Sequence, residues 1–237
     1  MSKSFTIAFR FALLSIGILI AQSCSDSKEP IIQIKPHNSI VLIGNNLGSR
    51  MMNYGSLETE LHLRYPKDSL FIRNMSDAGD TPGFRPHSGR VSPWAFPGAE
   101  KFQTELAQNS GSEGEFETPD EWLTRLNADI ILAFFGYNES FEGAEGLENY
   151  KEELDAFIKH SVKQKYNGTS TPQLVLISPI AFEDLSDHID VPNGISENQN
   201  LKLYTDAMSE VAAATYLLLM FIIRRKNGLK IPMKTTP

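Results

Sequence analysis

The feature that most constrains this fold is the segment of residues 39–50, which reads S-I-V-L-I-G-N-N-L-G-S-R. A short apolar run at residues 40–43 ends at Gly44 and is followed by a small polar turn. Apolar residues then recur with helical spacing. A buried strand, a tight turn and a helix in this order hold a reactive or binding group at the carboxyl end of a strand in α/β folds. We therefore expect Asn45 and Asn46 at such a strand end.

The same alternation continues along the chain. Short apolar runs predict further strands at residues 70–73, 129–135 and 174–177. A helix is expected to begin at Leu47 and to end before Pro66. A second helix is expected over residues 147–162, where apolar residues recur with helical spacing. A capping box at residues 196–199 predicts the start of a last helix. The motif T-P-D-E at residues 118–121 also predicts a helix start. Strands alternating with helices predict a parallel sheet covered by helices on both faces.

Residues 74–117 form a long segment rich in Gly, Pro, Ser and charged residues, without helical or strand periodicity. A loop of this length inside a compact domain is expected to be functional or mobile. Trp94 and Phe96 either line a cleft there or fix the loop onto the body of the protein.

Composition excludes one class of partner. The chain has 237 residues, 41% hydrophobic and 22% charged, with a net charge of −7. This composition is typical of one globular domain, and an acidic balance argues against nucleic acid, which needs a basic surface. The histidines are scattered without ligand spacing, so we expect neither a metal site nor a cofactor.

The first residues are typical of an export signal. Lys3 and Arg10 precede an apolar stretch at residues 11–21, which is too short to span a bilayer, and Cys24, the only cysteine, follows. This resembles a bacterial lipoprotein signal. It predicts a signal peptide at residues 1–23, a lipid anchor on Cys24, a tether at residues 24–38 and a location in the cell envelope, periplasmic or outer-membrane. The alternative is a cleaved secretory signal with an incidental cysteine.

Small polar clusters follow three of the expected strands, and the carboxyl ends of parallel strands meet at one edge of a sheet. The segments I-V-L-I-G-N-N-L-G-S-R-M, R-N-M-S-D-A-G-D-T-P-G-F-R-P, F-F-G-Y-N-E-S-F and L-V-L-I-S-P-I-A carry a resemblance to a known family. The chain resembles the SGNH/GDSL hydrolase superfamily of esterases and lipases, and more closely the GDSL-like proteins of Planctomycetes, Verrucomicrobia and Bacteroidetes. The resemblance runs from about residue 40 to residue 214.

The resemblance implies a flavodoxin-like three-layer α/β/α sandwich, here as a domain of residues 39–214. In the family, a serine attacks an ester carbonyl, while a glycine N–H and an asparagine amide hold the oxyanion. On this pattern Gly79 and Asn138 fall on the oxyanion positions, and Asn46 stands at the serine position.

The chain also departs from the family pattern. Asn45 replaces the acidic neighbour of the serine. In the family, an Asp-x-x-His motif near the C-terminus supplies the base and the residue that orients it, and no such motif occurs in this sequence. Residues 215–237 depart from the pattern altogether. We therefore expect the fold to be incomplete at its C-terminal end, where an atypical tail replaces the last block.

Each candidate site residue keeps a structural alternative. Asn138 could be a loop cap, Gly79 a plain turn glycine and Asn46 a helix cap. Asn45 and Glu139 are expected to bind substrate, because they are next in sequence to Asn46 and Asn138. The alternative for Glu139 is a solvated charge. Arg50 could bind an anionic substrate or pair with an acid.

These observations leave three hypotheses for function. The first is a lipid-anchored extracytoplasmic hydrolase acting on ester bonds of a small molecule or glycan, such as an acylated carbohydrate. Because serine and base are missing, its activity is expected to be weak or absent. The second is a non-catalytic module that binds a carbohydrate or acyl group in the same pocket. The third is a truncated gene product that folds poorly.

Overall fold

Five parallel strands form one sheet, in the order β2-β1-β3-β4-β5. The computed structural model describes residues 32–87, 89–109, 114–214 and 218–220. The strands are β1 Ser39–Gly44, β2 Phe71–Asn74, β3 Ile130–Phe134, β4 Gln173–Ile177 and β5 Leu218–Met220. This is the flavodoxin-like strand order. It confirms the predicted fold class of a parallel α/β sheet.

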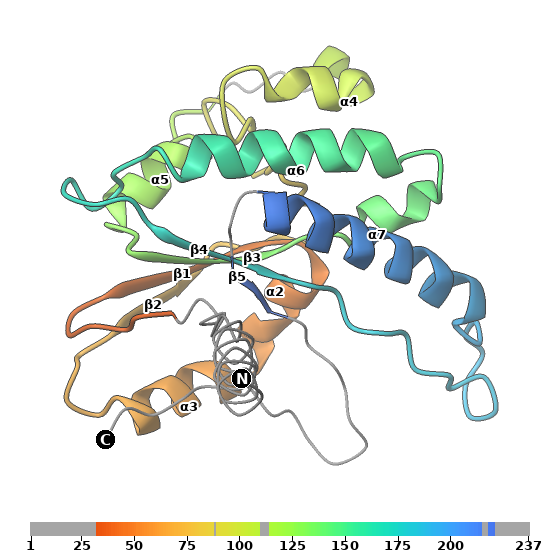
Figure 1. Cartoon of the computed structure of the whole chain (residues 1–237), viewed down its shortest axis with the longest axis horizontal. Helices are drawn as coiled ribbons and strands as arrows, with labels where there is room; N and C mark the ends of the chain where they lie inside the picture. Colours follow the sequence, from red (N-terminus) through yellow and green to blue (C-terminus); the bar gives the residue numbers. More distant parts are fainter. Residues whose placement is uncertain (1–31, 88, 110–113, 215–217, 221–237) are drawn as a thin grey trace, which may run out of the picture. The chain divides into compact units, whose positions relative to one another are not determined.

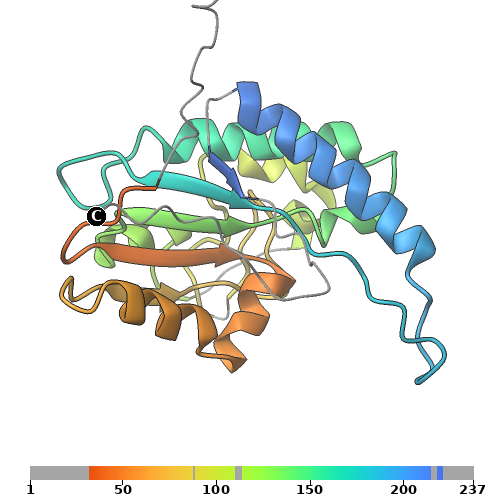
Figure 2. The same cartoon turned by 60° about the horizontal axis from the view of Figure 1, so that its bottom comes forward.

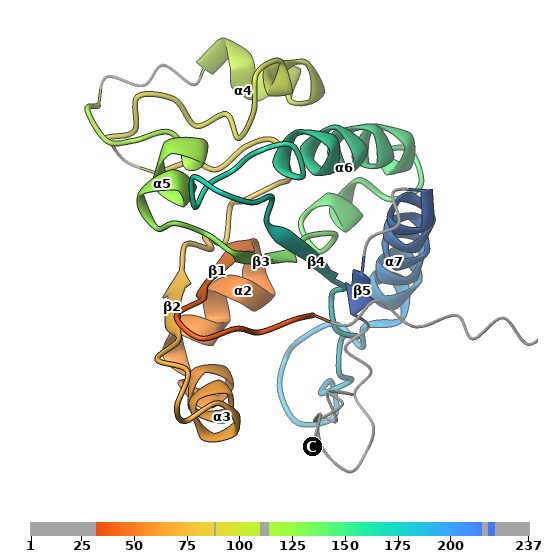
Figure 3. The ribbon, with the colours of Figure 1, turned by 60° about the vertical axis from the view of Figure 1, so that its left-hand side comes forward.

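Helices cover both faces of this sheet, which makes three layers (Figure 1). On one face lie α6 and α7, and α3 lies on the other; Figure 2 shows the sheet between them, and Figure 3 shows the same layers from the side. The α-helices are α2 Asn46–Arg50, α3 Ser56–Arg64, α4 Thr104–Asn109, α5 Pro119–Arg125, α6 Leu147–Ser161 and α7 Ile195–Ala214. Short 3-10 helices occupy Met51–Asn53, Ala99–Phe102 and Glu139–Glu142.

Alternation along the strands builds two separate hydrophobic cores. Val41 and Ile43 of β1 face the core under α6 and α7, whereas Ile40 and Leu42 face the core under α3. Every residue of β1 and β3 is buried, because both faces of these central strands are covered. Their continuous apolar runs in the sequence follow from this placement.

The parallel register brings the carboxyl ends of the strands to one edge. Leu42 pairs with Asn74, Gly44 with Phe134, and Phe134 with Ile177. The segments that follow β1, β2, β3 and β4 therefore all start at this edge. Three of them, the segments after β1, β2 and β3, carry the small polar clusters that the sequence analysis identified.

One predicted helix is wrong. The run from Leu47 to Tyr65 is not a single helix but α2, a 3-10 turn and α3. The break falls at Tyr54, which is extended with φ −137° and ψ 110°, and at Gly55, which precedes α3. Tyr54 is 69% exposed, so it does not belong to a buried face of a continuous helix.

Two other local predictions need correction. The last helix begins at Ile195, so Ser196 lies inside it, and Asn193 Oδ1 instead accepts the N–H of Ile195 at 3.1 Å. The long segment 74–117 is mostly irregular as expected, but it contains a 3-10 turn at Ala99–Phe102 and helix α4. Within it, Phe96 is buried in the core and Trp94 packs against that core, so both residues fix the loop onto the body.

The predicted helix start at Thr118 is confirmed. Its side chain accepts the N–H of Glu121 at 3.2 Å, while the Glu121 carboxylate accepts the N–H of Thr118 at 2.9 Å. Pro119 is the first residue of the helix. This reciprocal pair satisfies two backbone donors that the first turn of a helix leaves free.

The ends of the chain bear on the remaining predictions. A fifth strand, β5, lies within the residues expected to form an atypical tail, and its backbone pairs with β4. The signal peptide, Cys24, most of the tether and the remainder of the tail lie outside the described residues. The domain boundaries therefore stay predictions. Within the described ranges, no helix has both the length and the apolar character needed to span a bilayer.

Gly44 controls how the chain leaves β1. Its φ is +111°, and a Cβ there would lie 2.2 Å from the carbonyl oxygen of Phe134. Only glycine tolerates both the dihedral angle and the close approach of β3. Gly44 therefore sets the direction in which Asn45 and Asn46 emerge.

We predict that Gly44→Ala lowers the free energy of unfolding by about 2 kcal/mol or more, because backbone strain adds to the clash with Phe134. Chemical denaturation measures this loss. Gly98→Ala is the matched control, since Gly98 also has a positive φ of 85° but open space around it. It should cost about 1 kcal/mol. Equal losses in the two variants would contradict the close-approach argument.

Candidate functional site

A pocket of about 260 Å³ opens at the carboxyl ends of β1, β3 and β4. The strand order reverses direction between β1 and β3, and in open α/β sheets ligands bind in the crevice at this point. We call it the strand-end pocket. It is lined by Asn45, Asn46, Leu47, Arg50, Phe134, Phe135, Tyr137, Ile177, Ser178, Pro179 and Ile180.

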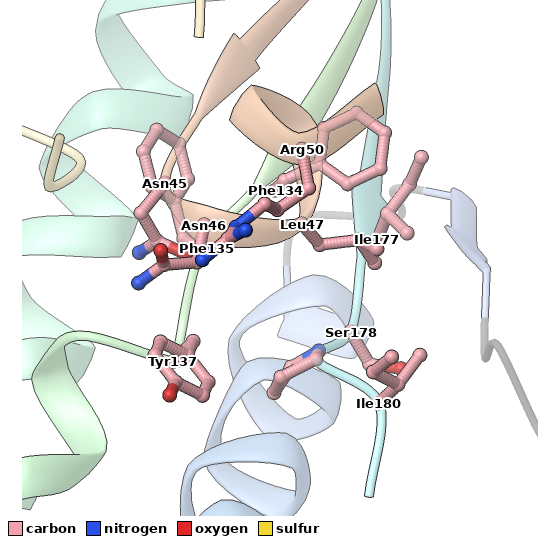
Figure 4. A pocket seen from close by; sticks show the side chains of 11 residues that line it. Asn45, Asn46, Leu47, Arg50, Phe134, Phe135, Tyr137, Ile177, Ser178 and Ile180 are labelled. Carbon is pink, nitrogen blue, oxygen red and sulfur yellow. The ribbon is translucent and has the colours of Figure 1, made fainter. Parts of the chain in front are cut away.

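Most of the wall of the strand-end pocket is apolar, with a few polar groups on it. Figure 4 shows Asn45, Asn46 and Arg50 along one side, and Tyr137, Ser178 and Ile180 across from them. Arg50 is exposed and forms no ion pair with any acid that the structure describes. An apolar lining with a few placed polar groups is typical of small-molecule sites.

A buried carboxyl group ties the ends of β1 and β3 together behind this wall. Glu139 Oε2 accepts the N–H of Gly136 at 2.8 Å and the Asn45 Nδ2 group at 3.1 Å. The Asn45 N–H donates to the carbonyl of Phe134 at 2.8 Å, which extends the ladder between the two strands. Glu139 is 6% exposed and Asn45 1%. The carboxyl group therefore fixes the side chain of Asn45 in the pocket wall.

Burial also changes the acidity of this region. It raises the pKa of Glu139 from 4.5 to about 8, and the negative charge of Glu153 adds to the shift. Burial likewise raises the pKa of Asp80 to about 7, although the positive charge of Arg85 opposes this. At neutral pH Glu139 is therefore mainly protonated and uncharged.

The side chain of Asn46 meets the side chain of Asn138. Asn46 Nδ2 donates to Asn138 Oδ1 at 3.0 Å. Asn138 Nδ2 in turn donates to the carbonyls of Ala78 at 2.7 Å and Asp80 at 3.1 Å. This chain of hydrogen bonds links the segments after β1, β2 and β3. Both N–H groups of the Asn138 amide are thereby engaged within the protein.

Gly79 lies at the outer end of the same group. Its N–H donates to Asp77 Oδ1 at 3.2 Å, and the residue is exposed. Its backbone donor is therefore engaged by a side chain of its own turn, as in a common aspartate turn.

The structure divides the predicted site residues into two groups. Asn45, Asn46 and Arg50 line the strand-end pocket, while Glu139, Asn138 and Gly79 do not. Glu139 and Asn138 instead hold the wall from behind. The alternative in which Glu139 is a solvated charge does not hold, because its carboxyl group is buried. Asn46 makes no capping bond; it is the first residue of α2, after Asn45.

Two further residue types bear on chemistry at this site. Ser49 lies inside α2 and is not part of the pocket wall. Among the described residues, no histidine lines the pocket, and no cluster of three or more His, Cys, Asp or Glu side chains could hold a metal ion.

Sequence reasoning missed part of the pocket. Tyr137, Ser178 and Ile180 form the side across from the asparagines. Tyr137 and Ser178 are each near a strand end, and this position could have marked them. The sequence does not show that Ile180, two residues further on, turns back toward the same space.

The structure resembles solved enzymes, although no known family model and no curated protein matches the chain. The gut microbial diltiazem-metabolizing enzyme BT4096 matches with a TM-score of 0.51 and 14% identity, over 81% of this chain and 38% of that chain. The chain thus spans well under half the length of that enzyme. At this identity the similarity shows the fold alone.

Two other solved structures match with lower TM-scores. The acetylxylan esterase Axe2 from Geobacillus stearothermophilus matches with a TM-score of 0.48 and 11% identity, over 79% of this chain and 77% of that chain. The α/β hydrolase LAE5 from the metagenome of Lake Arreo, Spain, matches with a TM-score of 0.46 and 14% identity, over 78% and 77%. The fold of the described residues is a three-layer α/β/α sandwich.

We predict that the stability of the protein falls as pH rises from about 4.5 to about 8, and that Glu139→Gln reduces this dependence. Because the folded-state pKa of Glu139 is raised, the folded protein binds the proton more tightly than the unfolded chain. Its contribution is complete below pH 4.5 and is lost as pH rises through 8. Denaturant melts at several pH values measure the slope, at most about 1.4 kcal/mol per pH unit for one group.

Glu139→Gln keeps the shape and both accepted hydrogen bonds but cannot ionise. Asp80 remains in this variant, and its raised pKa gives a residual slope of the same sign. An unchanged slope in Glu139→Gln would show that Glu139 does not titrate in this range.

Proposed function

We propose that this chain is an SGNH/GDSL-type protein whose strand-end pocket binds the acyl group of a small-molecule or glycan ester without cleaving it rapidly. One observation carries this proposal. The side chain at the position where the family has its serine is Asn46, and its amide is hydrogen-bonded to Asn138.

The described wall of this pocket lacks the activated nucleophile, base and free oxyanion donors that ester cleavage needs. An amide nitrogen is not a nucleophile of the serine kind, and a weak hydroxyl would need an adjacent base. The amide of Asn138 already donates to two carbonyls, and Gly79 donates to Asp77, so these donors are not free for an oxyanion. Ser178 lines the pocket, but no histidine of the described residues lies in the wall beside it.

The lining of the pocket supports an acyl ligand. Leu47, Phe134, Ile177 and Ile180 give it apolar walls, and burial of a methylene group in such walls contributes about 0.8 kcal/mol. The guanidinium of Arg50, which pairs with no acid of the described residues, offers hydrogen bonds to a carboxylate or an ester carbonyl at the same pocket.

Ester hydrolysis is the second candidate function. It is supported by the hydrogen-bond chain from Asn46 through Asn138 to Ala78 and Asp80, which joins the three sequence blocks of the family. A conformation that releases the Asn138 amide would free an oxyanion donor at the pocket edge.

We also propose that the mature protein is anchored in the bacterial cell envelope by a lipid on Cys24, with the domain outside the cytoplasm. The charged start, the short apolar stretch and the small residues before Cys24 support this. A glycan or small-molecule ester is the ligand that fits such a location.

We predict that the full chain binds butanoate and that Arg50→Gln weakens this binding about 10-fold or more. Loss of a charged hydrogen bond costs about 1.5–3 kcal/mol, which corresponds to this change in Kd. Calorimetry measures the affinity. Arg73→Gln is the matched control, because Arg73 is exposed on β2 and does not line the pocket. No binding of butanoate to the full chain would overturn the acyl-site proposal.

We expect p-nitrophenyl butanoate to be hydrolysed no faster by the full chain than by the same protein after heat denaturation. Saturable turnover that is lost in Asn138→Ala and retained in Ser49→Ala would contradict binding without cleavage. It would establish the second candidate instead.

We predict that Cys24→Ser moves the protein from the membrane fraction to the soluble fraction of the producing bacterium. Acyl chains contribute roughly 0.8 kcal/mol of membrane affinity per buried methylene group, and the variant cannot carry them. Fractionation and metabolic labelling with a fatty acid measure the change. Ser25→Ala should behave as the original chain. Equal fractionation of all three would favour a cleaved secretory signal.

A further inference from the structure

A second cavity lies next to the strand-end pocket. Its volume is about 250 Å³, and it is formed by the 3-10 turn Glu139–Glu142, the segment after β4 and the first turns of α7. Tyr137 lines both cavities. One phenol ring therefore stands in the shared wall. We call the second space the α7 cavity.

The sizes of the two cavities point to one extended ligand. Pockets that hold small molecules have volumes of roughly 300–1,000 Å³. Each cavity by itself falls below this range, whereas the two together fall within it. A ligand that reaches across Tyr137 would use both.

Aromatic rings give the α7 cavity its character. Phe141 is 69% exposed, and its ring meets the ring of Tyr137 edge-on, with centroids 5.4 Å apart and an angle of 81°. An aromatic ring held in this exposed position offers a flat apolar face to a ligand. The C–H face of a sugar ring fits such a surface.

Polar groups supply the other half of a sugar site. Ser196, Glu197 and Asn200 line the cavity from α7. The Glu197 carboxylate accepts the Ser196 hydroxyl at 3.0 Å, and the Asn200 amide has no hydrogen-bond partner among the described residues. Donors and acceptors of these kinds suit the hydroxyl groups of a sugar.

Charge separates the two cavities. The α7 cavity is lined by one carboxylate and by no described Lys or Arg, while the strand-end pocket is lined by Arg50 and by no described acid. An anionic group is therefore disfavoured at the α7 cavity. The neutral, hydroxyl-rich end of a ligand belongs there.

Hydrogen bonds hold the wall of the α7 cavity in place. Phe182, which lines it, donates its N–H to Asn198 Oδ1 at 2.7 Å and accepts Asn198 Nδ2 at its carbonyl at 3.0 Å. This pair fixes the segment after β4 to α7. On the other side, the Ser140 hydroxyl donates to the carbonyl of Tyr137 at 2.7 Å.

We propose that the α7 cavity is a sugar subsite, and that the ligand is a short-chain acyl ester of a neutral sugar that spans both cavities. The acyl chain lies in the strand-end pocket, and the sugar ring lies against Phe141 with its hydroxyl groups at Glu197 and Asn200. This inference rests on the proposed acyl site, since that site fixes which end of the ligand enters which cavity.

The test compares three probes on the full chain by calorimetry: butanoate, glucose and 6-O-butanoylglucose. We expect the ester to bind more tightly than either part. Phe141→Ala and Asn200→Ala should each weaken binding of the ester about 3- to 10-fold, the loss expected for one aromatic contact or one hydrogen bond. Neither variant should change the affinity for butanoate by more than about 2-fold.

The outcomes separate this inference from the acyl-site proposal. Phe71→Ala is the matched control, because Phe71 is 50% exposed on the edge strand β2 and lies in neither cavity wall. If butanoate binds but the sugar adds no affinity, or both variants leave the ester unaffected, the sugar subsite is wrong. If butanoate does not bind, the acyl site itself fails.

Discussion

The site depends on the buried contact between Glu139 and the ends of β1 and β3. One carboxyl oxygen accepts both the Gly136 N–H and the Asn45 amide, so a side chain from one strand end fixes the geometry of another. Burial keeps the carboxyl group uncharged at neutral pH, and this avoids the cost of an isolated buried charge. Without this contact, the Asn45 side chain and the Gly136 N–H would lose the carboxyl group that joins them.

This arrangement supports the proposal that the strand-end pocket binds a ligand without cleaving it. The two residues that fall on the oxyanion positions of the SGNH/GDSL pattern bind other parts of the protein: Asn138 donates to two backbone carbonyls and Gly79 to an aspartate. Pre-organised donors accelerate a reaction only where they face the developing charge. The apolar pocket, Arg50 and the neighbouring α7 cavity remain as features for binding.

Much of the fold followed from the sequence because its signals are local. Apolar runs of strand length, the amphipathic pattern of α6 and the capping box at Thr118 each depend on neighbours within a few residues, and all three are confirmed. The failures have local causes too. Gly55 interrupts a periodic apolar pattern that otherwise reads as one helix, and the side chain of Asn193, not Ser196, accepts the first free N–H of α7.

The sequence by itself determined the α/β class, the edge of the sheet at which the candidate site lies, and the presence of Asn46 where the SGNH/GDSL pattern that the chain resembles has a serine. Only the tertiary structure decided what each candidate site residue contacts. The pairings Asn45–Glu139 and Asn46–Asn138 join residues 94 and 92 positions apart in the chain. The burial that raises the pKa of Glu139 comes from packing against other parts of the chain, as does the position of Tyr137 between two cavities. Such contacts depend on how the layers pack, and no local pattern encodes them.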